Sequence, residues 1–219
     1  MVVERPADFW RKQSAAERYE PVRFHGLKGR LYRALEERAI GKALQMLKPG
    51  STMLDAACGT GRITALLLKS EFAVCGSDIS LAMMSVARRQ MSQLSTRASL
   101  VQCDVGRLPF RDACFDAVTC IGLLMHLDAD ARVRALQDLA RVSRHLLLVQ
   151  YGRVDAFQRI KTWLTGRPAG NVRYSVVEAE LRADQQRAGL NELARFWVLR
   201  PLSSSVVLLL SKRSECRNR

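Results

Sequence analysis

Three aspartates and two glycines have the spacing of a ligand-binding site. Asp55 begins the stretch Asp-Ala-Ala-Cys-Gly-Thr-Gly-Arg, which contains Gly59 and Gly61. Neither glycine carries a Cβ atom, so the backbone there can turn tightly and approach a ligand closely. Asp78 follows Asp55 by 23 positions, a spacing typical of an acid that binds the hydroxyl pair of a ribose. Together with Asp104, these residues predict a site for a ligand that contains adenosine.

Strands and a helix must bring these residues together, and the sequence predicts them. Residues 52–54, 72–78 and 99–103 are short apolar runs typical of buried strands, and an aspartate lies at or just after the end of each run. Residues 63–69 place their apolar side chains on one helical face. Because this helix follows the glycines, the free N–H groups of its first turn face the same crevice as the aspartates.

The glycine stretch also narrows the class of ligand. Thr64 stands where a G-x-G-x-x-G dinucleotide turn has its third glycine, which packs the helix closely beside a pyrophosphate. No Gly-Lys-Ser/Thr follows, so a P-loop is excluded. Three acids at three strand ends suit an amine, a ribose and an adenine better than a pyrophosphate. A nicotinamide dehydrogenase is therefore a distant alternative.

Five stretches of the chain together resemble the motifs of one family. They are residues 55–61 (motif I), 76–80 (motif II), 104–110 (motif III and its usual sequel), 115–118 (the strand-four motif) and 124–127 after it. On these residues the chain resembles the class I S-adenosylmethionine-dependent methyltransferases. It is most similar to the small-molecule branch that includes the ubiquinone/menaquinone-biosynthesis enzymes.

The resemblance covers residues 47–151 and implies an α/β fold. This is a Rossmann-like, doubly wound, mostly parallel seven-stranded sheet with helices on both faces and the last strand antiparallel. The alternation of strands and helices favours the same class. We expect one methyltransferase domain over residues 1–219. Its expected parts are an N-terminal lid-like segment (1–29), a cofactor-binding core (30–151), a substrate-side insertion with closing strands (152–211) and a basic tail (212–219).

Several elements outside the motifs are predicted from pattern alone. Residues 1–29 are polar and irregular, and an amphipathic helix follows over 31–47. Ser80 is a suitable N-cap for a helix over 81–92, and Asp128 or Asp130 for a helix that reaches Ser143. Near the end, Ser175 and Glu178 form a capping-box pattern for a helix that ends at Gly189. Residues 191–199 and 204–211 are expected to be the closing strand pair.

The resemblance implies S-adenosylmethionine as the methyl donor and S-adenosylhomocysteine as the product. Asp78 is expected to accept hydrogen bonds from both ribose hydroxyls. Asp104, with Val105, is expected to frame the adenine and to accept a hydrogen bond from its exocyclic amine. Asp55 and the backbone of residues 59–61 are expected to hold the methionine end. Cys58 and Cys120 are interpreted as small apolar spacers rather than nucleophiles, and Met83 as an adenine contact or a core methionine. The expected cofactor-binding residues are Asp55, Ala57, Cys58, Gly59, Gly61, Asp78, Ile79, Met83, Asp104, Val105 and Cys120.

The acceptor side offers two histidines as candidate catalytic residues. His126 lies just past the fourth strand, where a base for an O-methyltransferase would be placed, and histidine titrates near neutral pH. Alternatively, His126 is a loop histidine that packs at the start of a helix and has no catalytic role. His25, in the lid-like segment, is the second candidate, and a surface histidine is its alternative. No metal site is expected, because the three histidines are far apart in the sequence.

The amino-acid composition limits the kinds of partner that this protein is expected to bind. Lys and Arg number 35 against 21 Asp and Glu, for a net charge of +14. Such an excess suggests nucleic acid, a membrane surface or an acidic substrate. No basic stretch interleaves aromatic residues as base-stacking platforms would, so we interpret the charge mainly as a solvated surface. No apolar run is long enough to span a bilayer and no signal peptide is visible, so a cytoplasmic protein is expected.

The predicted function is methyl transfer to an oxygen or carbon of an anionic or hydrophobic small molecule. The family's Asn-Pro-Pro-Tyr-like run is absent after the fourth strand, which disfavours methylation of nucleobase nitrogens. Two alternatives remain: an RNA methyltransferase, suggested by the basic charge, and a non-catalytic cofactor-binding module of the same fold. The oligomeric state stays open.

Overall fold

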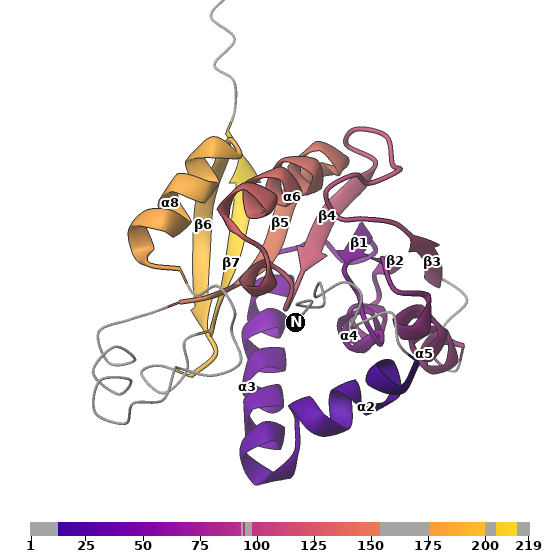
Figure 1. Ribbon diagram of the computed structural model, residues 1–219. Helices are drawn as coiled ribbons and strands as arrows, with labels where there is room; N and C mark the ends of the chain where they lie inside the picture. The colour runs from indigo at the N-terminus through magenta and orange to yellow at the C-terminus, as the bar shows by residue number, and fades with distance from the viewer. Residues whose placement is uncertain (1–12, 93, 95–97, 154–175, 200–204, 214–219) are drawn as a thin grey trace, which may run out of the picture.

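The computed structural model describes residues 13–92, 94, 98–153, 176–199 and 205–213. In this part of the chain one sheet has the strand order β3-β2-β1-β4-β5-β7-β6 (Figure 1). Strands β1 to β5 run parallel, and β7 runs antiparallel to both of its neighbours, which confirms the predicted fold class. The strands are β1 (Thr52–Ala56), β2 (Ala73–Asp78), β3 (Ala98–Gln102), β4 (Phe115–Cys120), β5 (Ser143–Gly152), β6 (Leu190–Trp197) and β7 (Ser205–Lys212).

Helices cover both faces of the sheet. On one face, Ile40 of α3 and Leu67 of α4 belong to an apolar cluster with Leu148 of β5. On the other face, Leu136 of α6 and Leu181 of α8 belong to a second cluster. The described helices are α2 (Gln13–Arg23), α3 (Gly26–Leu44), α4 (Arg62–Lys69), α5 (Leu81–Met91), α6 (Ala129–Val142) and α8 (Glu178–Arg187), with a 3₁₀ turn η1 (Leu124–His126).

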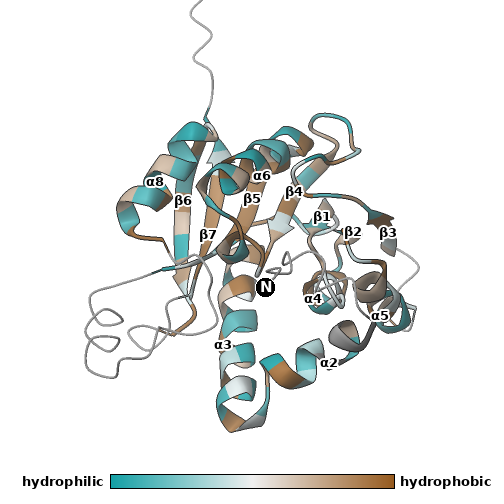
Figure 2. Ribbon diagram, in the orientation of Figure 1, coloured by the Kyte–Doolittle hydropathy of each residue, from teal (hydrophilic) through white to brown (hydrophobic). Residues whose placement is uncertain are grey.

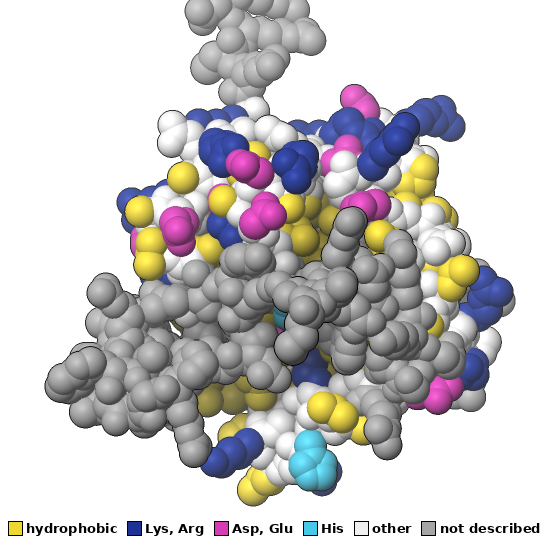
Figure 3. Space-filling view, viewed as in Figure 1, with side chains coloured by type: hydrophobic (Ala, Val, Ile, Leu, Met, Phe, Trp, Pro, Cys, Tyr) yellow, Lys and Arg dark blue, Asp and Glu magenta, His cyan; other side chains and the backbone are white. Residues whose placement is uncertain are grey.

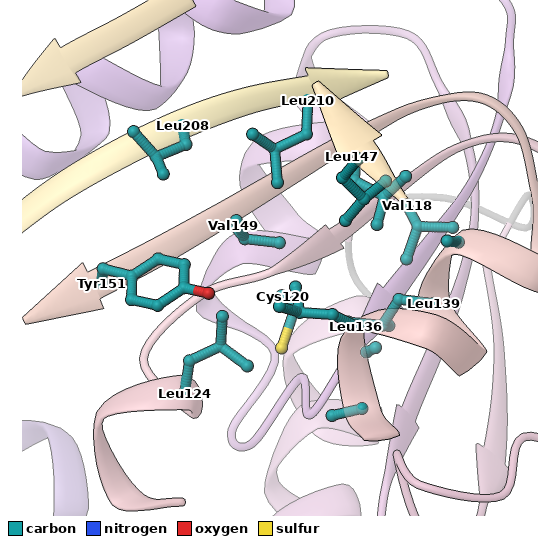
Figure 4. Packing of buried hydrophobic residues seen from close by; sticks show 14 of the residues in the cluster. Val118, Cys120, Leu124, Leu136, Leu139, Leu147, Val149, Tyr151, Leu208 and Leu210 are labelled. Carbon is teal, nitrogen blue, oxygen red and sulfur yellow. The ribbon is translucent and has the colours of Figure 1, made fainter. Parts of the chain in front are cut away.

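Strand β7 illustrates how this sequence makes a sheet buried on both faces. Residues 205–210 are all buried. Val207 and Leu209 point to the cluster of α3 and α4, whereas Leu208 and Leu210 point to the cluster of α6 and α8 (Figure 4). A strand covered on both faces has a continuous apolar run instead of an alternating one. The central strands are accordingly rich in hydrophobic residues along their length (Figure 2).

The predicted helix caps next to the sheet are confirmed. The Met83 N–H donates to the Ser80 hydroxyl at 3.2 Å at the start of α5. The Ala131 N–H donates to the Asp128 carboxylate at 2.9 Å, so Asp128 is the residue that caps α6. Both helices therefore begin at fixed points just beyond the carboxyl ends of β2 and β4.

The prediction for the N-terminal segment was wrong in two respects. Residues 13–23 form helix α2 instead of an irregular segment, and α3 begins at Gly26 instead of residue 31. Gly26 adopts a φ of +67°, which turns the chain between the two helices. A Cβ at Gly29 would lie 2.4 Å from the Phe24 carbonyl carbon, so this glycine allows the corner to close tightly.

The start of the C-terminal helix was also predicted incorrectly. Val176 still has strand geometry, because its N–H donates to the Gly152 carbonyl at 2.9 Å. Helix α8 consequently begins at Glu178, and Glu180 accepts a hydrogen bond from the Val177 N–H at 3.0 Å. The helix ends before Gly189 as predicted, with a φ of +68° at that glycine. Ser175 and most of the predicted insertion (154–175) lie outside the described residues.

Candidate active site

The two glycines after β1 have different roles in the structure. Gly59 has a φ of +57° and Gly61 a φ of +88°, conformations that side chains with a Cβ rarely adopt. A Cβ at Gly59 would meet no atom within 4 Å, whereas a Cβ at Gly61 would lie 2.9 Å from the Cβ of Ala87 in α5. Gly59 therefore leaves space for a ligand, and Gly61 allows α5 to pack against the turn.

A cavity of about 430 Å³ lies at the carboxyl ends of the central parallel strands. Ligands of open α/β sheets bind at this edge. The helix α2 forms one wall of the cavity, the glycine turn a second, and the segment between β4 and α6 a third. Its acidic lining residues outnumber its basic ones, although the whole chain carries a net charge of +14. The charged lining residues are Glu20, Arg23, Asp55, Arg62, Asp78, Asp104 and Asp128.

Most of the residues expected to bind a cofactor line this single cavity. They come from the glycine turn, the end of β2, the start of α5 and the turn after β3, and His126 lines the same cavity. The lining residues among those predicted are Asp55, Ala57, Cys58, Gly59, Asp78, Ile79, Met83, Asp104, Val105 and His126.

Three of the predicted site residues do not line the cavity. Gly61 packs against α5, as described above. Cys120 is fully buried in the apolar cluster between the sheet and α6 (Figure 4). His25 is exposed at the corner between α2 and α3 and is not among the residues that line the cavity. Burial raises the pKa of the Cys58 and Cys120 thiols well above the usual range, which agrees with their interpretation as apolar spacers.

Asp55 is a buried acid held by two hydroxyl groups. Its side chain accepts hydrogen bonds from Thr64 at 2.6 Å and Thr119 at 2.9 Å, and the residue is 1% exposed. Burial raises the pKa of the carboxyl from its usual 3.8 to about 6, although both hydroxyls and the charge of Arg62 oppose the shift. Thr64 thus replaces the third glycine of a dinucleotide turn with a side chain that orients Asp55.

Asp78 ties the glycine turn to the second strand. One of its carboxylate oxygens accepts from the Gly59 N–H and the other from the Ser80 N–H, both at 2.8 Å. Burial raises the pKa of this carboxyl, although the backbone N–H groups that donate to it favour its charged form. A carboxylate oxygen can accept a second hydrogen bond, so Asp78 keeps acceptor capacity for a ligand in the cavity.

A charged network between α2, α3 and α4 was missed by the sequence analysis. Glu36 of α3 is fully buried, and Arg62, the first residue of α4, donates a hydrogen bond to it. The guanidinium of Arg23 lies 3.7 Å from the Glu36 carboxylate, and Gln150 of β5 donates to the same carboxylate at 2.6 Å. Arg23 and Arg62 both line the cavity, so this buried acid fixes two cations at its wall.

A second contact fastens α2 over the glycine turn. The Thr60 hydroxyl donates to the Glu20 carboxylate at 2.6 Å, and Arg33 of α3 binds the same carboxylate at 3.2 Å. Glu20 thereby joins the turn, α2 and α3 at one point. The segment that the sequence analysis expected to be lid-like therefore contributes a helix to the cavity wall.

Comparison with known proteins shows which family the central part of the chain is similar to. Residues 53–145 match the protein family described as "Methyltransferase domain". This segment of the chain is therefore similar to methyltransferase domains. The matched segment contains Asp55, Asp78, Asp104 and His126, whereas α2 and α3 precede it.

Two curated relatives of the methyltransferase domain act on different classes of substrate according to their names. The chain is 34% identical over 152 residues to the ubiquinone/menaquinone biosynthesis C-methyltransferase UbiE of Xylella fastidiosa, a match that covers 60% of each chain. It is 37% identical over 100 residues to the probable tRNA methyltransferase 9B of Bos taurus, which covers 45% of this chain and 20% of that protein. The chain thus spans less than two thirds of the length of each relative.

The fold of the matched segment and its surroundings is shared with solved structures. The magnesium protoporphyrin IX methyltransferase of Synechocystis, crystallised with bound S-adenosylhomocysteine, superposes with a TM-score of 0.79 at 18% sequence identity. The superposition covers 94% of this chain and 97% of that one. The likeness in fold therefore extends beyond the matched residues 53–145.

Proposed function

We propose that the chain is an S-adenosylmethionine-dependent methyltransferase that acts on an oxygen or carbon of a small molecule. The observation that carries this proposal is the convergence of Asp55, Asp78 and Asp104 on one cavity beside the open backbone of Gly59. The excess of acids over bases in the lining suits a ligand with two cationic centres, an ammonium and a sulfonium. When bound, this cofactor supplies a methyl group already activated by its sulfonium.

Each wall of the cavity has a proposed task in binding. Asp78 accepts hydrogen bonds from the ribose hydroxyls, and Asp104 accepts a hydrogen bond from the adenine amine. Asp55 holds the ammonium of the methionine end. Ile79, Met83 and Val105 offer apolar contacts to the adenine. Arg23, whose side chain is 24% exposed, is the more accessible of the two cations for the methionine carboxylate.

The acceptor is proposed to bind between η1 and α2. This end of the cavity is lined by the apolar Ile121, Leu123 and Leu127 together with His126, which favours a hydrophobic acceptor with an acidic proton. We propose His126 as the base that accepts that proton. Since the donor is already activated, the main task of these residues is to hold the acceptor in line with the methyl group.

An RNA methyltransferase is the second candidate, and two observations favour it: the net charge of +14 and the tRNA methyltransferase among the relatives. A labelled methyl group offered to the full chain with a lipid extract, a polar metabolite extract and transfer RNA separates the candidates. We expect incorporation into one of the small-molecule extracts. Salt-sensitive incorporation into RNA would establish the second candidate, and incorporation into none of the three would favour a non-catalytic module.

A further inference from the structure

The corner between α2 and α3 exposes three large apolar side chains close together. Val22 is 73% exposed, Leu27 83% and Leu31 53%. Leu27 and Leu31 are four residues apart in α3, so they lie on the same face of that helix. Val22 lies near the end of α2, just across the corner. Exposed apolar residues that gather in this way mark interaction sites more often than single ones do.

The same corner is basic. Residues 21–35 contain four Lys and Arg residues and no Asp or Glu. Arg23 and Arg33 pair with the flanking Glu36 and Glu20, so Lys28 and Arg30 are the cations that the corner presents to solvent. Lys28 and Arg30 are exposed and lie between Leu27 and Leu31 in the sequence. Figure 3 shows yellow and dark blue side chains next to a histidine at the lower end of the molecule, where Figure 1 places the corner. The surface is therefore apolar and cationic at once.

This combination is the signature of helices that lie on an anionic bilayer. Exposed leucines can enter the headgroup region while lysine and arginine bind the anionic lipids. Nucleic acid would bind the cations but would gain little from Leu27 and Val22. No helix in the described ranges is long and apolar enough to cross a membrane. We propose that the α2–α3 corner docks this protein on the surface of an anionic membrane.

Docking at this corner would place a wall of the cavity against the membrane. Val22 points outward from α2, whereas Tyr19 and Arg23 of the same helix line the cavity. A hydrophobic acceptor dissolved in the bilayer would then reach the site through a short path. This last step rests on the proposed function, but the docking itself does not.

Co-sedimentation of the full chain with lipid vesicles tests the proposal. We expect binding to phosphatidylcholine vesicles that contain phosphatidylserine and weak binding to phosphatidylcholine alone. Leu27→Ser with Leu31→Ser should lower the partition coefficient about tenfold. Lys28→Ala with Arg30→Ala should lower it about 25-fold, since each cation near the surface contributes about fivefold. The matched apolar control is Leu193→Ser on β6, because Leu193 and Leu31 are both 53% exposed.

The outcomes separate this proposal from its rivals. Equal vesicle binding by the wild type and both corner variants would overturn it, as would an equal loss in the Leu193→Ser control. Binding to transfer RNA that depends on Lys28 and Arg30, with no vesicle binding, would make the corner an RNA surface. Titration with S-adenosylhomocysteine in solution is run alongside. If no S-adenosylhomocysteine binding is detected, this would count against the proposed function and leave the docking result standing.

Discussion

Replacing Asp55 by asparagine should change the pH dependence of stability in a calculable way. Burial raises the pKa of this carboxyl from its usual 3.8 to about 6. The difference of about two units corresponds to about 3 kcal/mol of free energy of unfolding. Between these two values the folded state keeps the proton that the unfolded state has lost. The contribution is therefore fully present below about pH 3.8 and is lost as the pH rises through about 6.

Asparagine cannot ionise, so the Asp55→Asn variant lacks this contribution. Urea unfolding of both proteins between pH 3 and pH 8 gives the difference in unfolding free energy, in which the titration of groups that do not interact with Asp55 cancels. We expect the wild type to lose about 3 kcal/mol relative to the variant across this range. A difference that stays flat with pH would refute the burial argument for Asp55.

Asp116 supplies a control with the opposite sign. Hydrogen bonds from the Thr52 N–H and hydroxyl, both at 2.9 Å, lower the pKa of its carboxyl, and the nearby Arg144 adds to this. The contribution of Asp116 to the free energy of unfolding is fully present above the pKa of the unfolded state. It is lost as the pH falls through the lower pKa of the folded state. The Asp116→Asn difference curve should therefore slope in the opposite direction to that of Asp55→Asn.

Three further substitutions test other parts of the structure. His126→Ala should slow methyl transfer about 100-fold or more without weakening S-adenosylhomocysteine binding, and His145→Ala, an exposed control, should change neither. Arg132→Met should lower the free energy of unfolding by about 3–5 kcal/mol, because it leaves Asp184 buried without its 2.8 Å ion pair. Gly61→Ala should cost about 1–3 kcal/mol in the same urea assay, since its φ is +88° and its Cβ would press on α5. No change in unfolding for either variant would contradict the packing described.

The position of the three aspartates could be predicted because it follows from strand direction. Parallel strands end at the same edge of a sheet, so Asp55, Asp78 and Asp104 had to converge once three buried strands were assigned. The exclusion of Cys120 from the cavity, in contrast, needed the structure. Side chains alternate along a strand, and since Thr119 of β4 points to Asp55, the next residue must face the other side.

The charged network behind the cavity could not be predicted in this way. Glu36 and Glu37 are neighbours on an amphipathic helix, and nothing local distinguishes the fully buried one from the partly exposed one. The partner Arg62 lies 26 positions away in the sequence and Gln150 lies 114 away. Such pairs are set by how α3 packs on the sheet, which the pattern of a single helix does not contain.

Calorimetric titration with S-adenosylhomocysteine tests the central claim most directly. The wild type should bind one equivalent, and Asp78→Asn should weaken binding about 10- to 100-fold, because a hydrogen bond to a charged group is lost. Asp116→Asn, an acid outside the cavity lining, should bind like the wild type. Undetectable binding by the wild type, or equal binding by wild type and Asp78→Asn, would contradict the assignment of this cavity as the cofactor site.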